Sequence, residues 1–231
     1  MTREVRAACD AAVEGGADDI LVKDAHDSAR NIDPSNLPEA ARLFRGWDSS
    51  PLSMMAGLDS SFDGVVFTGY HSAAGSDGNP LSHTMNLGVQ YMKINGEYTS
   101  EFVINSYTAG YFGVPVLFLS GDRQLCESAG RLNKNIKTVA VSEGHGSGSI
   151  SINPDLAVER IRKGVFAALD DDRSKYSIKL PEGFNVEVCF KEHPPACRGG
   201  YYPGAVRIGP KTVSFESENY MDVLKFLFFV L

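Results

Sequence analysis

The sequence has few cysteines, and none is paired at the spacing of a metal knuckle. The four cysteines among 231 residues are Cys9, Cys126, Cys189 and Cys197, and no two of them form a C-x-x-C motif. These intervals exclude a zinc ribbon. They favour reduced thiols in a protein of the cytoplasm.

Basic clusters, a secretory leader and long apolar runs are also missing. The formal net charge is −7, and no local group of Lys and Arg makes the basic patch that nucleic-acid binding requires. Residues 1–10 are charged and lack the apolar core of a signal peptide. The apolar run at residues 226–231 is too short to cross a bilayer. We therefore expect no nucleic-acid partner and no membrane partner.

Common catalytic motifs are absent as well. The Gly-rich stretch at residues 143–149 has neither the G-K-[ST] ending of a P-loop nor a G-x-G-x-x-G fingerprint, and we interpret it as a flexible interdomain loop. No G-x-S-x-G elbow supports an α/β-hydrolase triad. Cys197 and His193 are separated by two prolines, so we expect a plain loop there and no thiol nucleophile.

Short apolar runs alternate with amphipathic segments through the first part of the chain. Strands are predicted at residues 19–23, 64–68, 89–94, 114–119 and 138–141, and helices at 2–14, 100–112 and 124–132. Continuous apolar strands that alternate with helices predict an α/β fold, in which helices sandwich a mostly parallel sheet.

The pattern changes after the Gly-rich stretch. A helix at residues 153–169, strands near 184–190 and 211–216, and a last helix from about 218 predict a smaller C-terminal α+β domain. We place the boundary near residue 147, so the predicted domains are residues 1–147 and 148–231.

Histidines and a glutamate gather where buried strands end. His26 and His71 each follow a predicted parallel strand, His83 lies in the next loop, and Glu101 begins the next helix. That edge of an α/β sheet is the usual binding crevice, and imidazole with carboxylate is the ligand set of Zn²⁺ or a similar ion. Plainer roles stay open, namely hydrogen-bonded histidines at strand ends and an acidic residue that interacts with a helix dipole. Two aspartates at the same edge are either ligands or turn and N-cap residues: Asp24 and Asp122.

Several short motifs stand in a fixed order. They are K-D-A-H-D (23–27), S-M-M-A-G-L-D (53–59), T-G-Y-H (68–71), L-S-H-T-M (81–85), S-E-F-V-I-N-S-Y-T-A-G-Y (100–111), V-P-V-L (114–117) and S-G-D (120–122). In this order they resemble the DppA-type zinc-dependent D-aminopeptidases. The resemblance is dense to about residue 122 and looser afterwards.

This resemblance implies a fold, an activity and a site. The fold is an α/β domain joined to a smaller α+β domain, and the activity is removal of an N-terminal D-amino acid from short peptides at a site with two Zn²⁺ per subunit. The implied metal ligands are His26, His71 and Glu101, and the implied catalytic residue is His83. The resemblance also implies a homo-oligomer in the form of a closed ring.

One family feature has no counterpart in the sequence. The family begins with a strand that ends in an Asp-x-Glu motif and supplies two further ligands, whereas this sequence begins at a position that matches the inside of the first family helix. We expect that strand inside the parallel sheet, near the strands that precede His26 and His71. Three hypotheses stay open: an active D-aminopeptidase, a catalytically inactive binding or scaffold homologue, and a one-metal hydrolase of altered specificity.

Overall fold

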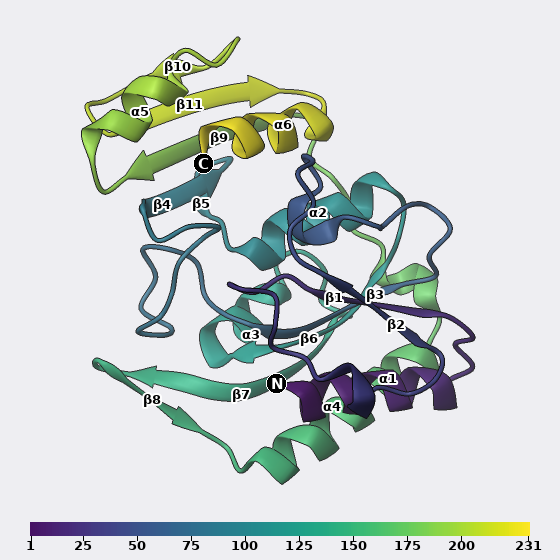
Figure 1. Cartoon of the computed structure of the whole chain (residues 1–231). Coiled ribbons are helices and arrows are strands. Elements are labelled where there is room, and N and C mark those ends of the chain that lie inside the picture. Colours follow the sequence, from purple (N-terminus) through teal and green to yellow (C-terminus); the bar gives the residue numbers. More distant parts are fainter.

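A computed structural model describes residues 1–231, and helices and strands alternate along the chain (Figure 1). The helices are α1 (Thr2–Glu14), α2 (Glu101–Tyr111), α3 (Arg123–Ala129), α4 (Pro154–Leu169), α5 (His193–Gly199) and α6 (Tyr220–Val230). The strands are β1 (Ile20–Asp24), β2 (Ala41–Arg45), β3 (Val65–Tyr70), β4 (Val89–Ile94), β5 (Glu97–Tyr98), β6 (Val116–Asp122), β7 (Lys137–His145), β8 (Gly148–Ser151), β9 (Phe184–Phe190), β10 (Val206–Arg207) and β11 (Thr212–Ser217).

The central sheet has the strand order β3-β6-β7-β8, with β3, β6 and β7 parallel and β8 antiparallel. All residues of β6 are buried, as a parallel strand covered on both faces requires. Helices α1 and α4 pack together on one face, and α2 and α3 lie on the other (Figure 1). This arrangement confirms the predicted α/β fold with helices around a mostly parallel sheet.

A second sheet, antiparallel throughout, has the order β10-β11-β9-β4-β5. Helices α5 and α6 cover it, and its buried face shares a core with α6 that includes Val186, Val188 and Phe226. Strands β4 and β5 come from the first half of the chain, while α4 returns to the central sheet. The sheets therefore exchange segments across residue 147, and the domains 1–147 and 148–231 stay a prediction.

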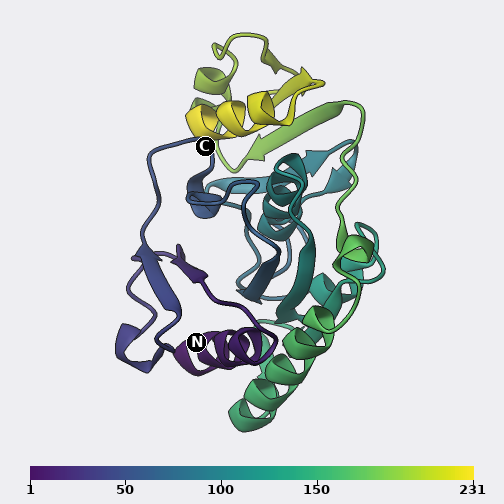
Figure 2. The ribbon, with the colours of Figure 1, turned by 90° about the vertical axis from the view of Figure 1, so that its right-hand side faces the viewer.

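Strand β1 lies outside the sheet that we expected it to join. It pairs in parallel with β2 in a separate two-stranded sheet, which Figure 2 shows apart from the central layer. Strands β1 and β3 thus each have a strand partner on one side only. The end of β1, with His26 after it, is therefore not held by hydrogen bonds to β3.

Three local predictions were wrong. The Gly-rich stretch is a β-hairpin of β7 and β8, because Gly146 supplies the positive φ of 58° that its tight turn needs. The prolines between His193 and Cys197 begin helix α5, since proline suits the first helical turn. The set of predicted strands also missed β2, which lies between the strands predicted at residues 19–23 and 64–68.

No helix of the structure combines the length and the apolar character that crossing a bilayer demands. The four cysteines are all free. Burial raises the pKa of the Cys9 thiol to about 11 and that of Cys126 to about 12, so both stay protonated at neutral pH.

Candidate metal and catalytic site

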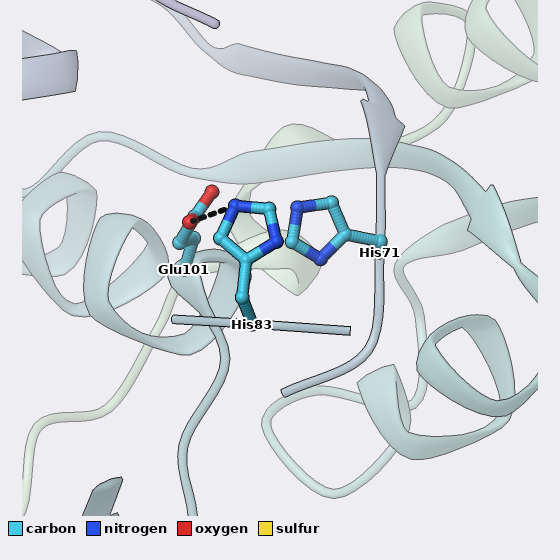
Figure 3. A group of neighbouring side chains, drawn as sticks. All are labelled: His71, His83 and Glu101. Atoms are coloured by element: carbon cyan, nitrogen blue, oxygen red, sulfur yellow. Dashed lines mark ion pairs between the residues drawn. The ribbon is translucent and has the colours of Figure 1, made fainter. Parts of the chain in front are cut away.

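Three of the four predicted site residues form one group. The candidate ligand atoms of His71, His83 and Glu101 all lie within 4.8 Å of one another. Figure 3 shows the ring of His83 between the carboxylate of Glu101 and the ring of His71. The two imidazole rings lie 4.3 Å apart between centroids, at 33° to each other. The structure thus brings together residues that are 30 positions apart in the sequence.

His71 is positioned by the end of β3 and by a buried aspartate of the neighbouring strand. Asp122, at the end of β6, accepts hydrogen bonds from the backbone N–H of Ser72 at 2.6 Å and from its hydroxyl at 2.6 Å. The same carboxylate caps α3 through the N–H of Leu125 at 2.9 Å. Asp122 is therefore a cap and a support for the residue after His71, which was the plainer of its two predicted roles.

His83 lies in a loop that is anchored by its neighbour. The Thr84 hydroxyl is fully buried, accepts from the N–H of Ala74 at 3.0 Å and donates to the carbonyl of Thr99 at 2.9 Å. These bonds tie the loop to the residues that follow His71 and to those that precede Glu101. The position of His83 is thus fixed by buried backbone contacts on both sides.

Glu101 is the first residue of α2, and its carboxylate is almost wholly buried. Ser100 caps the helix, with its hydroxyl 3.4 Å from the N–H of Val103. The Glu101 Oε1 atom accepts the backbone N–H of Met85 at 2.9 Å, and it faces His83 Nε2 at 3.8 Å. The N-terminus of α2 and the Met85 N–H both direct partial positive charge toward this carboxylate.

Tyr70 and Asn105 lie next to the residues of this group and bind each other. Asn105, one turn along α2 from Glu101, donates its side-chain N–H to the Tyr70 hydroxyl at 2.9 Å. Burial, with the nearby charge of Glu101, raises the pKa of Tyr70 well above its usual value. The phenol therefore stays protonated at neutral pH. The E-x-x-x-N spacing was visible in the sequence, but nothing in it indicated a tyrosine partner.

The hydrogen bonds of both histidines suit a bound cation. His71 Nδ1 lies 3.1 Å from the carbonyl of Ser72, and His83 Nδ1 lies 2.8 Å from the carbonyl of Leu81. A carbonyl only accepts, so the proton of each neutral ring is on Nδ1 and the lone pair is on Nε2. Metal-bound histidines use the same backbone partnership to fix their tautomer. Two imidazole lone pairs beside a buried carboxylate fit Zn²⁺, whose ligands include histidine and glutamate.

His26 is not a member of this group. It is exposed, and it follows β1, which pairs with β2 and not with β3. The preceding Asp24 is buried and accepts three bonds, from the N–H groups of Asn31 and Ile32 and from the Asn31 side chain. Asp24 therefore stabilises the loop that follows β1. The role of His26 as a metal ligand stays a prediction.

Arg123, the residue after Asp122, lies at the surface. Arg123 is exposed and forms an ion pair with Glu143 of β7. This pair joins α3 to the β7–β8 hairpin at the surface. Arg123 therefore contacts the hairpin and is not part of the group of His71, His83 and Glu101.

Comparisons with known proteins show the family of this chain. The sequence model of the M55 peptidase family, described as D-aminopeptidase, matches residues 1–229. A D-aminopeptidase of Bacillus subtilis (strain 168) is 31% identical over 225 residues, which cover 96% of this chain and 81% of the relative. The solved structure of "Zn-dependent D-aminopeptidase DppA from Bacillus subtilis, a self-compartmentalizing protease" superposes with a TM-score of 0.88 at 29% identity, covering 99% of this chain and 84% of that one. The chain belongs to the M55 family of D-aminopeptidases.

Proposed function

We propose that this chain hydrolyses the peptide bond after the N-terminal D-amino acid of short peptides, at a zinc site that His71 and Glu101 hold. The observation that carries the proposal is the group of His71, His83 and Glu101, in which both imidazoles keep a free Nε2 lone pair beside a buried carboxylate. The relatives are a D-aminopeptidase and a zinc-dependent D-aminopeptidase, which supports the same chemistry. The donor atoms of these three residues lie within 4.8 Å of one another, which supports an enzyme over an inactive binding protein.

Zinc bound here supplies Lewis-acid chemistry, because it polarises a carbonyl and lowers the pKa of water from 15.7 to about 7. Glu101, held by the Met85 N–H, keeps its carboxylate in place without rearrangement. His83 acts as the general base: its Nε2 takes the proton of the attacking water and then gives it to the leaving amine. The Leu81 carbonyl holds the Nδ1 proton throughout, so the ring keeps one tautomer before each turnover.

In this proposal His26 is the third of the three implied ligands that this sequence contains, and it serves the second ion of a two-zinc site. The zinc content of purified protein tests this assignment. His71→Ala and Glu101→Ala should each lose zinc and activity together. His26→Ala should lose one equivalent at most, because His26 lies outside the group of three.

The variant His83→Ala distinguishes a general-base role of His83 from a role as a zinc ligand. As a base, His83 contributes about 10²- to 10⁴-fold to kcat, while zinc content and melting temperature stay nearly unchanged. Loss of zinc together with activity would make His83 a third ligand. Full activity on D-alanyl peptides would refute the catalytic role.

We also propose that the chain assembles into a closed homo-oligomer in the cytoplasm. The solved relative is titled a self-compartmentalizing protease. Large apolar side chains are exposed on this chain, among them Leu81 (75%), Leu87 (70%) and Tyr201 (89%). Light scattering after size-exclusion chromatography measures the mass, and a monomer at micromolar concentration would contradict this proposal.

A further inference from the structure

An apolar cavity of about 340 Å³ opens beside the metal-binding group. Its walls come from residues 47–53, from the loop after His83, from α2 and from α6. The apolar lining includes Trp47, Leu52, Met85, Ile104, Leu224 and Phe228. Its volume is at the lower end of the range for small-molecule sites, which are mostly apolar with a few polar groups.

Two residues of the cavity lining, Met85 and Asn105, contact residues of the metal-binding group or their neighbours. Met85 lines the cavity, and its backbone N–H donates to Glu101 at 2.9 Å. Asn105 also lines it, one helical turn from Glu101, and binds the hydroxyl of Tyr70, the residue before His71. A substrate atom bound next to Glu101 is therefore one residue contact away from the cavity wall, through Met85.

Two residues of the cavity wall adopt backbone conformations that cost free energy. Ser53 has φ of 49° and Met85 has φ of 66°, and neither is a glycine. Such conformations cost about 1–3 kcal/mol and gather at ligand sites, where the surrounding structure holds them in place. Ser53 also lines the cavity, and its hydroxyl is buried without a hydrogen-bond partner. The strained backbone and the unpaired hydroxyl thus occur at the same residue of the wall.

We propose that this cavity binds a large apolar side chain of the peptide substrate, on a residue next to the scissile bond. The inference rests on the proposed function, since it names the substrates of the same site. A methyl group leaves most of a 340 Å³ cavity unfilled, whereas a leucine or phenylalanine side chain buries far more apolar surface there. The chain therefore prefers peptides with a large apolar residue over D-alanyl-glycine.

Trp47 is the only tryptophan of the chain and lines the cavity, so its fluorescence reports occupancy without any need for turnover. The probes are reduced-amide analogues of D-Phe-Gly, D-Ala-Phe and D-Ala-Gly, titrated into zinc-loaded protein. At least one phenylalanine analogue should shift the emission and bind about ten-fold or more tightly than the D-Ala-Gly analogue. The two phenylalanine analogues show which side of the scissile bond faces the cavity.

Narrowing the cavity provides the second arm of the test. Leu52→Tyr should abolish the preference for phenylalanine, while Leu156→Tyr on α4 is the matched control and should keep it. Equal affinity for all three analogues, or a preference that survives in a folded Leu52→Tyr variant, would overturn the inference. If the protein hydrolyses the peptides without this preference, the role of the cavity is refuted and the proposed function is not. If the protein shows the binding preference but hydrolyses no peptide, the proposed function is refuted and the binding role of the cavity is kept.

Discussion

Removal of the Asp122 carboxylate should both weaken zinc binding at the metal-binding group and destabilise the central sheet. Asp122 is 1% exposed and accepts three hydrogen bonds, two from Ser72 and one from the N–H of Leu125. Asp122→Ala leaves three buried donors without an acceptor, and each bond to a charged group is worth about 1.5–3 kcal/mol. Water entering the vacated space offsets part of that sum. We therefore expect a loss of about 3–5 kcal/mol in the free energy of unfolding, as for other broken buried charge networks.

Urea denaturation measures this loss, and competition with a chelator measures zinc affinity. Because Ser72 follows His71 directly, its release should weaken the first zinc equivalent by about 10- to 100-fold. Asp24→Ala is the matched control. Asp24 is also buried at a strand end and also accepts three bonds, but it holds the loop of His26. It should cost similar stability and leave the first zinc equivalent within about two-fold.

Two results would refute this reasoning. One is an Asp122→Ala protein that loses less than about 1 kcal/mol, which would show that the three bonds are replaced without cost. The other is an Asp24→Ala protein that weakens the first zinc equivalent as much as Asp122→Ala does. That result would place His26 and its loop in the same metal site as His71.

Further predictions concern the hairpin and the buried thiols. A Cβ atom at Gly144 would lie 2.8 Å from the carbonyl oxygen of Gly78, so Gly144→Ala should cost about 1–3 kcal/mol by thermal melting. Gly148→Ala is the control within the same hairpin, since its nearest new contact is an ordinary 3.7 Å, and a loss equal to that of Gly144→Ala would contradict the packing argument. The raised pKa values of Cys9 and Cys126 mean that above about pH 9 the unfolded chain releases thiol protons that the folded chain keeps. Stability should therefore fall as the pH rises from about 9 towards 11, by about 1.4 kcal/mol per thiol at pH 10, and Cys126→Ala should reduce that slope in alkaline denaturation.

The parts of the site that depend on local signals were predictable from the sequence. Ser100 and Glu101 precede an apolar periodic run, which predicts a helix start and places a carboxylate at its N-terminus. His71 follows a continuous apolar run, which predicts the end of a buried strand. Because both signals are local, the structure reproduces them within a residue or two.

The parts that depend on pairing between distant segments were not predictable. An apolar run such as β1 predicts a buried strand, but its partner is decided by which backbone edge lies beside it, and here that edge belongs to β2. For this reason His26 and His71 follow similar strands and yet do not share one group. Likewise β4 reads as a strand of the first half of the chain, although its hydrogen bonds go to β9.

The sequence does not decide whether Nε2 of His83 is a general base or a metal ligand. The family resemblance implies a catalytic role for His83, while the structure places its Nε2 3.8 Å from Glu101 Oε1 and its ring 4.3 Å from that of His71. The 3.8 Å from Nε2 to Glu101 Oε1 is too long for a hydrogen bond, so Glu101 does not occupy the Nε2 lone pair. A zinc ion shared by all three residues would draw Nε2 to about 2.0–2.1 Å, whereas a base must keep that lone pair for water. Thr84 and the Leu81 carbonyl hold the loop and the ring of His83 in either role. His83 is a ligand if zinc bound by His71 and Glu101 needs its Nε2, and a base if it does not. The zinc content of the His83→Ala variant distinguishes these two roles directly.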